Sequence, residues 1–123
     1  MIIGLGVDIV ELQRIKSSCE KFAQAFYNKI LTDHEQELLP IHPVPYLAAR
    51  FAAKEAAVKA LGTGFSHGIT PRDIEICSKP SGQPYLQFYG QALEHYQACG
   101  SSACHLSLTH GRDYAVAVVI LER

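Results

Sequence analysis

The sequence predicts an α+β fold, one compact domain over residues 1–123 in which a small antiparallel sheet packs against a long alanine-rich helix. Three observations lead to it. Segments of alternating hydrophobicity, typical of strands, stand at the amino terminus and throughout the last third of the chain. Apolar residues at three- and four-residue steps, typical of helices, follow the first strand. An alanine-rich stretch without a β-branched run lies in the middle. The expected order is β-α-α-α-β-β-α-β-β.

Length and composition limit the possible functions. The 123 residues suit one domain with its own core, 48% of them are hydrophobic, and the net charge is −1. These values argue against disorder and against bulk electrostatic binding to nucleic acid. The first apolar run is short and is interrupted by Asp8, so we expect no signal peptide, no membrane contact and a cytoplasmic location. The cysteines show no metal-type spacing and are expected to be small buried hydrophobes: Cys19, Cys77, Cys99 and Cys104.

The first predicted strand, residues 2–10, has one bare face. Gly4, Gly6 and Asp8 alternate with apolar residues, so the two glycines and the carboxylate share a side. This pattern leaves room for a bulky group to approach the backbone and meet Asp8, although an edge strand ending in a turn carboxylate explains it equally well. A dinucleotide-binding fingerprint is rejected, because Ile9 stands where its third glycine belongs.

Residues 11–30 read as an amphipathic helix with one apolar face. Its other face carries Arg14, Lys16 and Lys21, which are a docking patch for an acidic partner or a solvated surface. Thr32 and Glu35 then have capping-box spacing.

The capping box predicts a short helix from Asp33 to Leu39, which stops before Pro40. A proline-containing link over residues 42–45 leads into the alanine-rich helix.

The alanine-rich stretch, residues 50–64, is the strongest helix prediction, and Gly62 supplies its stop. Alanines four residues apart form smooth ridges that let another backbone come close. Glu55 lies on the remaining surface among three cations: Arg50, Lys54 and Lys59. These charges are either a solvated face with a Glu55–Lys59 pair or part of a site.

The rest of the chain alternates strands and turns around one more helix. A glycine-rich loop over residues 62–68 either cradles an anion or is a flexible connection. The remaining expected elements are strands at 74–78, 85–89, 105–110 and 114–121 and a helix near 91–99. His110 shares a strand face with apolar neighbours, and a single histidine there is more often structural than catalytic.

Asp8 and Glu55 are far apart in sequence, so only the fold can bring them together. If it does, two carboxylates beside several cations describe a magnesium site that binds substrate phosphates, since Mg²⁺ takes one or two protein carboxylates and keeps waters. The cations facing the phosphates would be Arg50, Lys54 and Lys59.

Three motifs in this order resemble those of the 4′-phosphopantetheinyl transferases, in the short form called holo-[acyl-carrier-protein] synthases. They are Gly-Leu-Gly-Val-Asp-Ile-Val at residues 4–10, Arg-Phe-Ala-Ala-Lys-Glu-Ala-Ala-Val-Lys-Ala at residues 50–60, and Leu-Ser-Leu-Thr-His at residues 106–110. With chain length and element order, the resemblance covers essentially the whole chain.

The resemblance implies an enzyme that transfers the 4′-phosphopantetheine arm of coenzyme A to a serine hydroxyl of apo-acyl carrier protein. The reaction releases adenosine 3′,5′-bisphosphate, requires Mg²⁺ and supports fatty acid biosynthesis. Asp8 and Glu55 correspond to the metal ligands, and Lys59 to a catalytic phosphate contact. Val10 stands where the larger, two-lobed relatives carry a third acidic ligand, so a water is expected there. The general base is either Glu55 or a metal-held water beside Asp8.

The resemblance further implies a homotrimer with active sites between subunits. Arg50, Thr109 and His110 match positions that meet the nucleotide end of coenzyme A, helped by the loop that starts at Gly62. Arg14 and Lys21 lie on the helix that docks the acidic carrier protein, which favours the docking patch. The alternative function is a non-catalytic module that binds coenzyme A or an acidic protein independently of magnesium.

Overall fold

A computed structural model describes residues 1–123. The elements follow the expected order, with one added 3₁₀ turn: β1 (Ile2–Glu11), α1 (Leu12–Ile30), α2 (Asp33–Glu37), α3 (Val44–Leu61), η1 (Pro71–Asp73), β2 (Ile74–Ser78), β3 (Pro84–Phe88), α4 (Gly90–Ala98), β4 (Ala103–His110) and β5 (Tyr114–Glu122).

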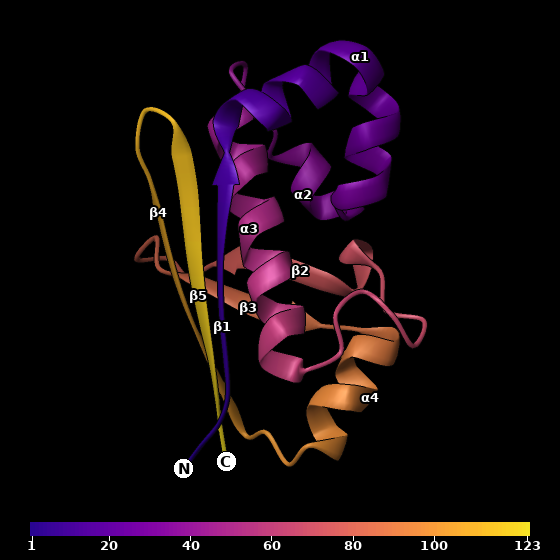
Figure 1. Ribbon diagram of the computed structural model, residues 1–123, viewed down its shortest axis with the longest axis vertical. Coiled ribbons are helices and arrows are strands. Elements are labelled where there is room, and N and C mark those ends of the chain that lie inside the picture. Colours follow the sequence, from indigo (N-terminus) through magenta and orange to yellow (C-terminus); the bar gives the residue numbers. More distant parts are fainter.

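Two antiparallel sheets are present. One has three strands in the order β1-β5-β4, and the other is the β2-β3 hairpin. All four helices lie on one side of the three-stranded sheet, with α3 running along it (Figure 1). The predicted packing of a small antiparallel sheet against the alanine-rich helix is therefore confirmed.

Helix α3 is the centre of the core because its surface is almost smooth. All seven of its alanines between positions 48 and 60 are buried. The glycines of β1 face this helix: a Cβ at Gly6 would lie 1.9 Å from the carbonyl oxygen of Ala56, and one at Gly4 would lie 2.3 Å from that of Ala60. The bulky group that the bare strand face admits is thus the backbone of α3.

Replacing Gly6 with alanine is expected to destabilise the protein by about 3 kcal/mol or more, because backbone rather than a flexible side chain blocks the new methyl group. Thermal unfolding followed by circular dichroism measures the loss. The matched control is Gly111→Ala, since a Cβ there meets nothing within 4 Å. Equal melting temperatures for the two variants would contradict this packing.

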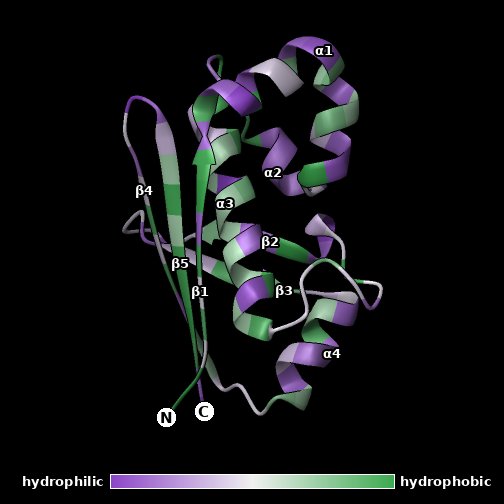
Figure 2. Cartoon of the chain, in the orientation of Figure 1, coloured by the Kyte–Doolittle hydropathy of each residue, from purple (hydrophilic) through white to green (hydrophobic).

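The opposite face of the three-stranded sheet carries no helix. Leu5, Val7 and Ile9 of β1 point to this side and expose 64%, 54% and 62% of their surface. Green, hydrophobic segments are prominent on β1 and β5 in Figure 2, whereas α1 and α2 are largely purple. The sheet therefore presents an apolar outer face, here defined by Leu5, Val7, Ile9 and their β5 neighbours.

Several element boundaries differ from the prediction. Helix α2 ends at Glu37 rather than Leu39, because the chain tightens and the Leu38 amide donates to the Glu35 carbonyl. The expected proline link over 42–45 is shorter, since Val44 and Pro45 form the first turn of α3, where proline costs no hydrogen bond. Helix α1 is kinked at Ala23.

The cysteine expectation is partly wrong. All four thiols are free, but Cys99 is exposed at the end of α4 because it lies on the turn that closes the helix. The other three are half-buried. No helix combines the length and apolar character that a bilayer crossing requires.

Candidate active site

The packing of β1 on α3 brings Asp8 and Glu55 together. Asp8 lies two residues after Gly6, on the same helix-facing side of β1, and Glu55 precedes Ala56, whose carbonyl abuts Gly6. Lys59, one turn after Glu55, donates from Nζ to Asp8 Oδ1 and to the Val7 carbonyl, each at 3.0 Å. The strand and the helix thus share a cluster of two carboxylates and an ammonium.

The pKa of Glu55 is set by burial and by the charges around it. Partial burial raises the pKa of Glu55, and the negative charge of Asp8 raises it further, whereas Lys59 and Arg14 lower it. The Glu55 carboxylate makes no hydrogen bond or ion pair. The Glu55–Lys59 pair that the spacing allowed is absent, because Lys59 binds Asp8 instead.

This carboxylate cluster fits a divalent cation. Glu55 and Asp8 Oδ2 have no hydrogen-bond partner, and like charges held close favour a cation between them. No group of three or more histidine, cysteine or acidic side chains is arranged to hold a metal. Two carboxylates are what Mg²⁺ takes when substrate phosphates and waters supply its other ligands.

A cavity of about 630 Å³ opens beside Glu55, between α1 and α3. Aromatic side chains give it an apolar lining, and cationic residues of α1 stand among its walls. The residues that set this character are Phe22, Phe26, Phe51, Phe65, Arg14 and Lys29. An apolar group flanked by negative charges would complement the lining of this cavity.

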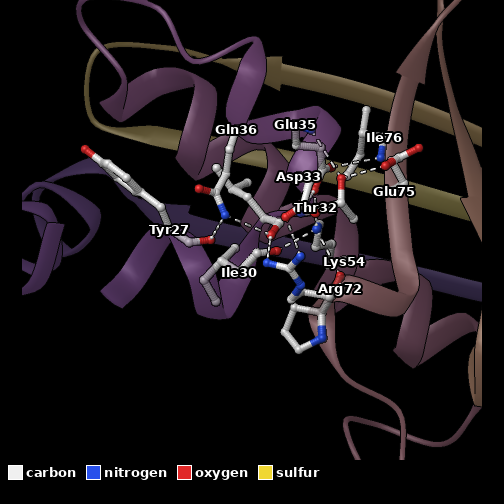
Figure 3. Close-up of polar contacts among 12 residues, drawn as sticks. Tyr27, Ile30, Thr32, Asp33, Glu35, Gln36, Lys54, Arg72, Glu75 and Ile76 are labelled. Carbon is white, nitrogen blue, oxygen red and sulfur yellow. Dashed lines mark hydrogen bonds and ion pairs between the residues drawn. The ribbon is translucent and has the colours of Figure 1, made fainter. Parts of the chain in front are cut away.

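The prediction that Lys54 faces phosphates is wrong. Its side chain is 1% exposed, and its ammonium lies among internal acceptors beside Glu35 (Figure 3). Nζ donates to Glu35 Oε1 at 2.6 Å, to the Ile30 carbonyl at 2.6 Å and to the Pro71 carbonyl at 2.9 Å. All three of its N–H bonds are therefore used by internal acceptors. Burial lowers the pKa of Lys54, and Glu35 opposes that shift.

Glu35, the carboxylate that accepts from Lys54, is held by a buried hydrogen-bond network that also includes Thr32 and β2. Glu35, which is 0% exposed, also accepts from the amides of Thr32 and Ile76. Thr32 in turn donates from its hydroxyl to Glu75 Oε2 at 2.5 Å. The capping box predicted for Thr32 and Glu35 is present, and the same Glu35 carboxylate anchors α3 and β2.

Two other predicted nucleotide contacts, Arg50 and Gly62, share no hydrogen bond or ion pair with Asp8. Arg50 stacks on the ring of Tyr46, with 3.8 Å between the guanidinium carbon and the ring centroid, and its Nε is buried without a partner. Gly62 is the left-handed C-cap of α3, and its amide donates to the Lys59 carbonyl.

The two predicted residues of β4 point to opposite faces of the sheet. His110 pairs with Ala115, which pairs with Val10, so it shares the helix-facing side with Asp8. Thr109 pairs with Val116 and lies on the apolar outer face with Ile9. Arg14 is exposed and borders the cavity, whereas Lys21 is exposed but not among its lining residues.

The family model for the 4′-phosphopantetheinyl transferase superfamily matches residues 4–119. The chain belongs to this superfamily. A holo-[acyl-carrier-protein] synthase of Maridesulfovibrio salexigens is 60% identical to this superfamily member over 124 residues, which cover all of both chains.

Solved structures of the superfamily share the fold. The crystal structure of the holo-[acyl-carrier-protein] synthase of Neisseria meningitidis aligns with a TM-score of 0.91 and 43% identity, covering all of both chains. The enzyme of Bacillus anthracis, solved in complex with CoA (3′,5′-ADP), aligns with a TM-score of 0.81 and 35% identity over 98% of this transferase and 96% of that chain.

Sequence reasoning missed two features of this transferase. The phenylalanines of the cavity come from α1, α3 and the following loop, so no single periodic pattern marks them as one surface. The apolar face predicted for residues 11–30 is not wholly buried, since Phe22 on this helix is 63% exposed. Glu35 was noted only as a capping residue, and nothing in its spacing indicates that it binds Lys54.

Proposed function

We propose that this chain transfers 4′-phosphopantetheine from coenzyme A to a serine hydroxyl of apo-acyl carrier protein. The observation that carries the proposal is the placement of Asp8, Glu55 and Lys59 in one cluster beside an apolar cavity. The superfamily membership and the full-length likeness to holo-[acyl-carrier-protein] synthases support it. The product would serve fatty acid biosynthesis in the cytoplasm, and residues 1–123 would form the single catalytic domain.

In this proposal Asp8 and Glu55 hold Mg²⁺, which when bound supplies neutralising charge to the pyrophosphate oxygens. The serine oxygen forms a bond to the β-phosphorus of coenzyme A, and the bond from that phosphorus to the bridging oxygen breaks, releasing adenosine 3′,5′-bisphosphate. Lys59 binds a phosphate oxygen as charge shifts toward the leaving group. The serine proton passes to Glu55 or to a water beside Asp8.

Carrier docking is proposed at the α1 surface next to this cluster. Arg14 stands close enough to Glu55 to lower its pKa, so a carrier bound there would deliver its serine beside the carboxylates. Lys21 extends the positive surface along the same helix. The cavity between α1 and α3 would receive an apolar side chain of the carrier.

We infer a homotrimer in which the apolar outer face is covered by neighbouring copies. Exposed Leu5, Val7 and Ile9 support burial of this face. Thr109 lies on the same face, so a second subunit would be needed to bring it near a cofactor held at Asp8. Sedimentation equilibrium is expected to give three times the 13.5 kDa chain mass. A monomeric mass would contradict the assembly.

The function is tested with purified protein, Mg²⁺, coenzyme A and apo-carrier protein, followed by intact-mass spectrometry of the carrier. One added phosphopantetheine per carrier is expected, with none when the metal is chelated. The apparent KM for the carrier should rise with salt if the docking surface is basic. Binding of coenzyme A without any mass gain, and without a need for magnesium, would favour the non-catalytic binding module.

A further inference from the structure

Lys59 binds one oxygen of Asp8, a carboxylate that the proposed metal site uses. Its ammonium donates to Asp8 Oδ1 and to the Val7 carbonyl, each at 3.0 Å. The Asp8 carboxylate has no other hydrogen-bond or ion-pair partner, and only 15% of the side chain is exposed. The positive charge that compensates this carboxylate in the chain alone is therefore supplied by Lys59.

The backbones of β1 and α3 are closely packed around this ion pair. Gly4 and Gly6 lie against the carbonyls of Ala60 and Ala56, which flank Lys59 on α3. This packing sets the positions of the Lys59 and Asp8 Cα atoms relative to each other. The Lys59 side chain is 52% exposed and has four rotatable bonds, so it is the part that can leave.

Two positive groups compete for one carboxylate. A divalent cation held by Glu55 and the free Oδ2 of Asp8 would lie beside the Lys59 ammonium on Oδ1, and the two positive charges would repel each other. Once freed, the ammonium stays one helical turn from Glu55 and needs a new anionic partner. The phosphate groups of coenzyme A are such a partner.

We propose that Lys59 is an internal counter-cation that neutralises Asp8 in the metal-free chain and is transferred to substrate phosphate when the metal binds. The inference rests on the proposed metal site at Asp8 and Glu55. Breaking the Lys59–Asp8 pair opposes binding of metal alone, and a phosphate that accepts Lys59 offsets this cost. Metal and coenzyme A therefore bind cooperatively, and each raises the affinity for the other by the same factor.

The test measures binding rather than turnover. Isothermal titration with Mg²⁺, and Mn²⁺ binding followed by electron paramagnetic resonance, are performed on the whole protein with and without coenzyme A. In Lys59→Met the affinity for metal alone is expected to rise about 3- to 10-fold, the gain from removing one partly exposed ion pair. Coenzyme A should then tighten metal binding less in Lys59→Met than in the unmodified chain.

The matched control is Arg14→Met. It removes the same charge near Glu55 but no bond to Asp8. A smaller gain in metal affinity for Arg14→Met than for Lys59→Met supports a direct competition. Equal gains in the two variants overturn a direct competition, because the metal affinity would then respond only to the loss of a nearby positive charge.

Two further results separate this inference from the proposed function. If the unmodified chain binds metal in the presence of coenzyme A but Lys59→Met binds metal alone no more tightly, the counter-cation role is overturned and the metal site stands. If no metal binds even with coenzyme A present, the metal site fails and the inference fails with it. Circular dichroism melting confirms that both variants are folded before titration.

Discussion

Replacement of Glu55 by glutamine is expected to lower turnover about a thousand-fold or more while leaving the fold intact. Glutamine keeps the size of the side chain but removes the negative charge that would hold the metal, and metal stabilisation of a transferring phosphate is worth several kcal/mol, at about 1.4 kcal/mol per tenfold in rate. Glu55 makes no hydrogen bond or ion pair, so its neutralisation leaves no buried partner unsatisfied. The measurement is the rate of carrier mass gain at saturating coenzyme A.

The control for Glu55→Gln is Glu94→Gln, the same change at an exposed position of α4. It should leave the rate unchanged. Metal titration of Glu55→Gln should show weakened binding in parallel with the lost rate. An active Glu55→Gln variant would remove Glu55 from the site, and an unfolded one would assign it a structural role.

Replacement of Lys54 by methionine, which removes the buried ammonium, is expected to lower the free energy of unfolding strongly. Methionine fits the volume but leaves the Glu35 carboxylate buried without its charged donor, which costs about 3–5 kcal/mol. For a domain of this size, that is a fall of about 10–20 °C in melting temperature. Thermal denaturation measures it.

The double variant Lys54→Met/Glu35→Gln removes both charges and should recover part of the loss. The control is Lys79→Met, an exposed lysine in the turn between β2 and β3, which should melt with the unmodified protein. If Lys54→Met instead melted with the unmodified protein, the buried network would not be a stabilising element.

The secondary structure was predictable because its signals are local. Alternation marked β1 and the later strands, and the Thr32–Glu35 box marked the start of α2. Alanine content marked α3. The grouping of Asp8 with Glu55 needed the family resemblance, since the two residues share no local pattern. Even so, the glycines of β1 and the alanine ridges of α3 already indicated that two backbones would meet closely.

The roles of the two lysines of α3 were decided only by the tertiary structure. Lys54 and Lys59 are both helical cations near Glu55 in sequence, yet one is buried against Glu35 and the other reaches Asp8. Helical periodicity determines the direction in which each side chain leaves the axis, but not which element covers that direction. For Lys54 the covering groups are α2 and η1, and for Lys59 the neighbour is the edge of β1.

The sequence by itself determined the order of elements, the close approach of β1 to α3 and the residue types available for a magnesium-phosphate site. The tertiary structure decided which charges are buried, which carboxylates lack partners, where the cavity lies and which sheet face remains uncovered. The physical reason is that backbone propensity and periodicity act over a few residues, whereas the burial and pairing of a charge depend on neighbours that the folded chain brings from distant positions.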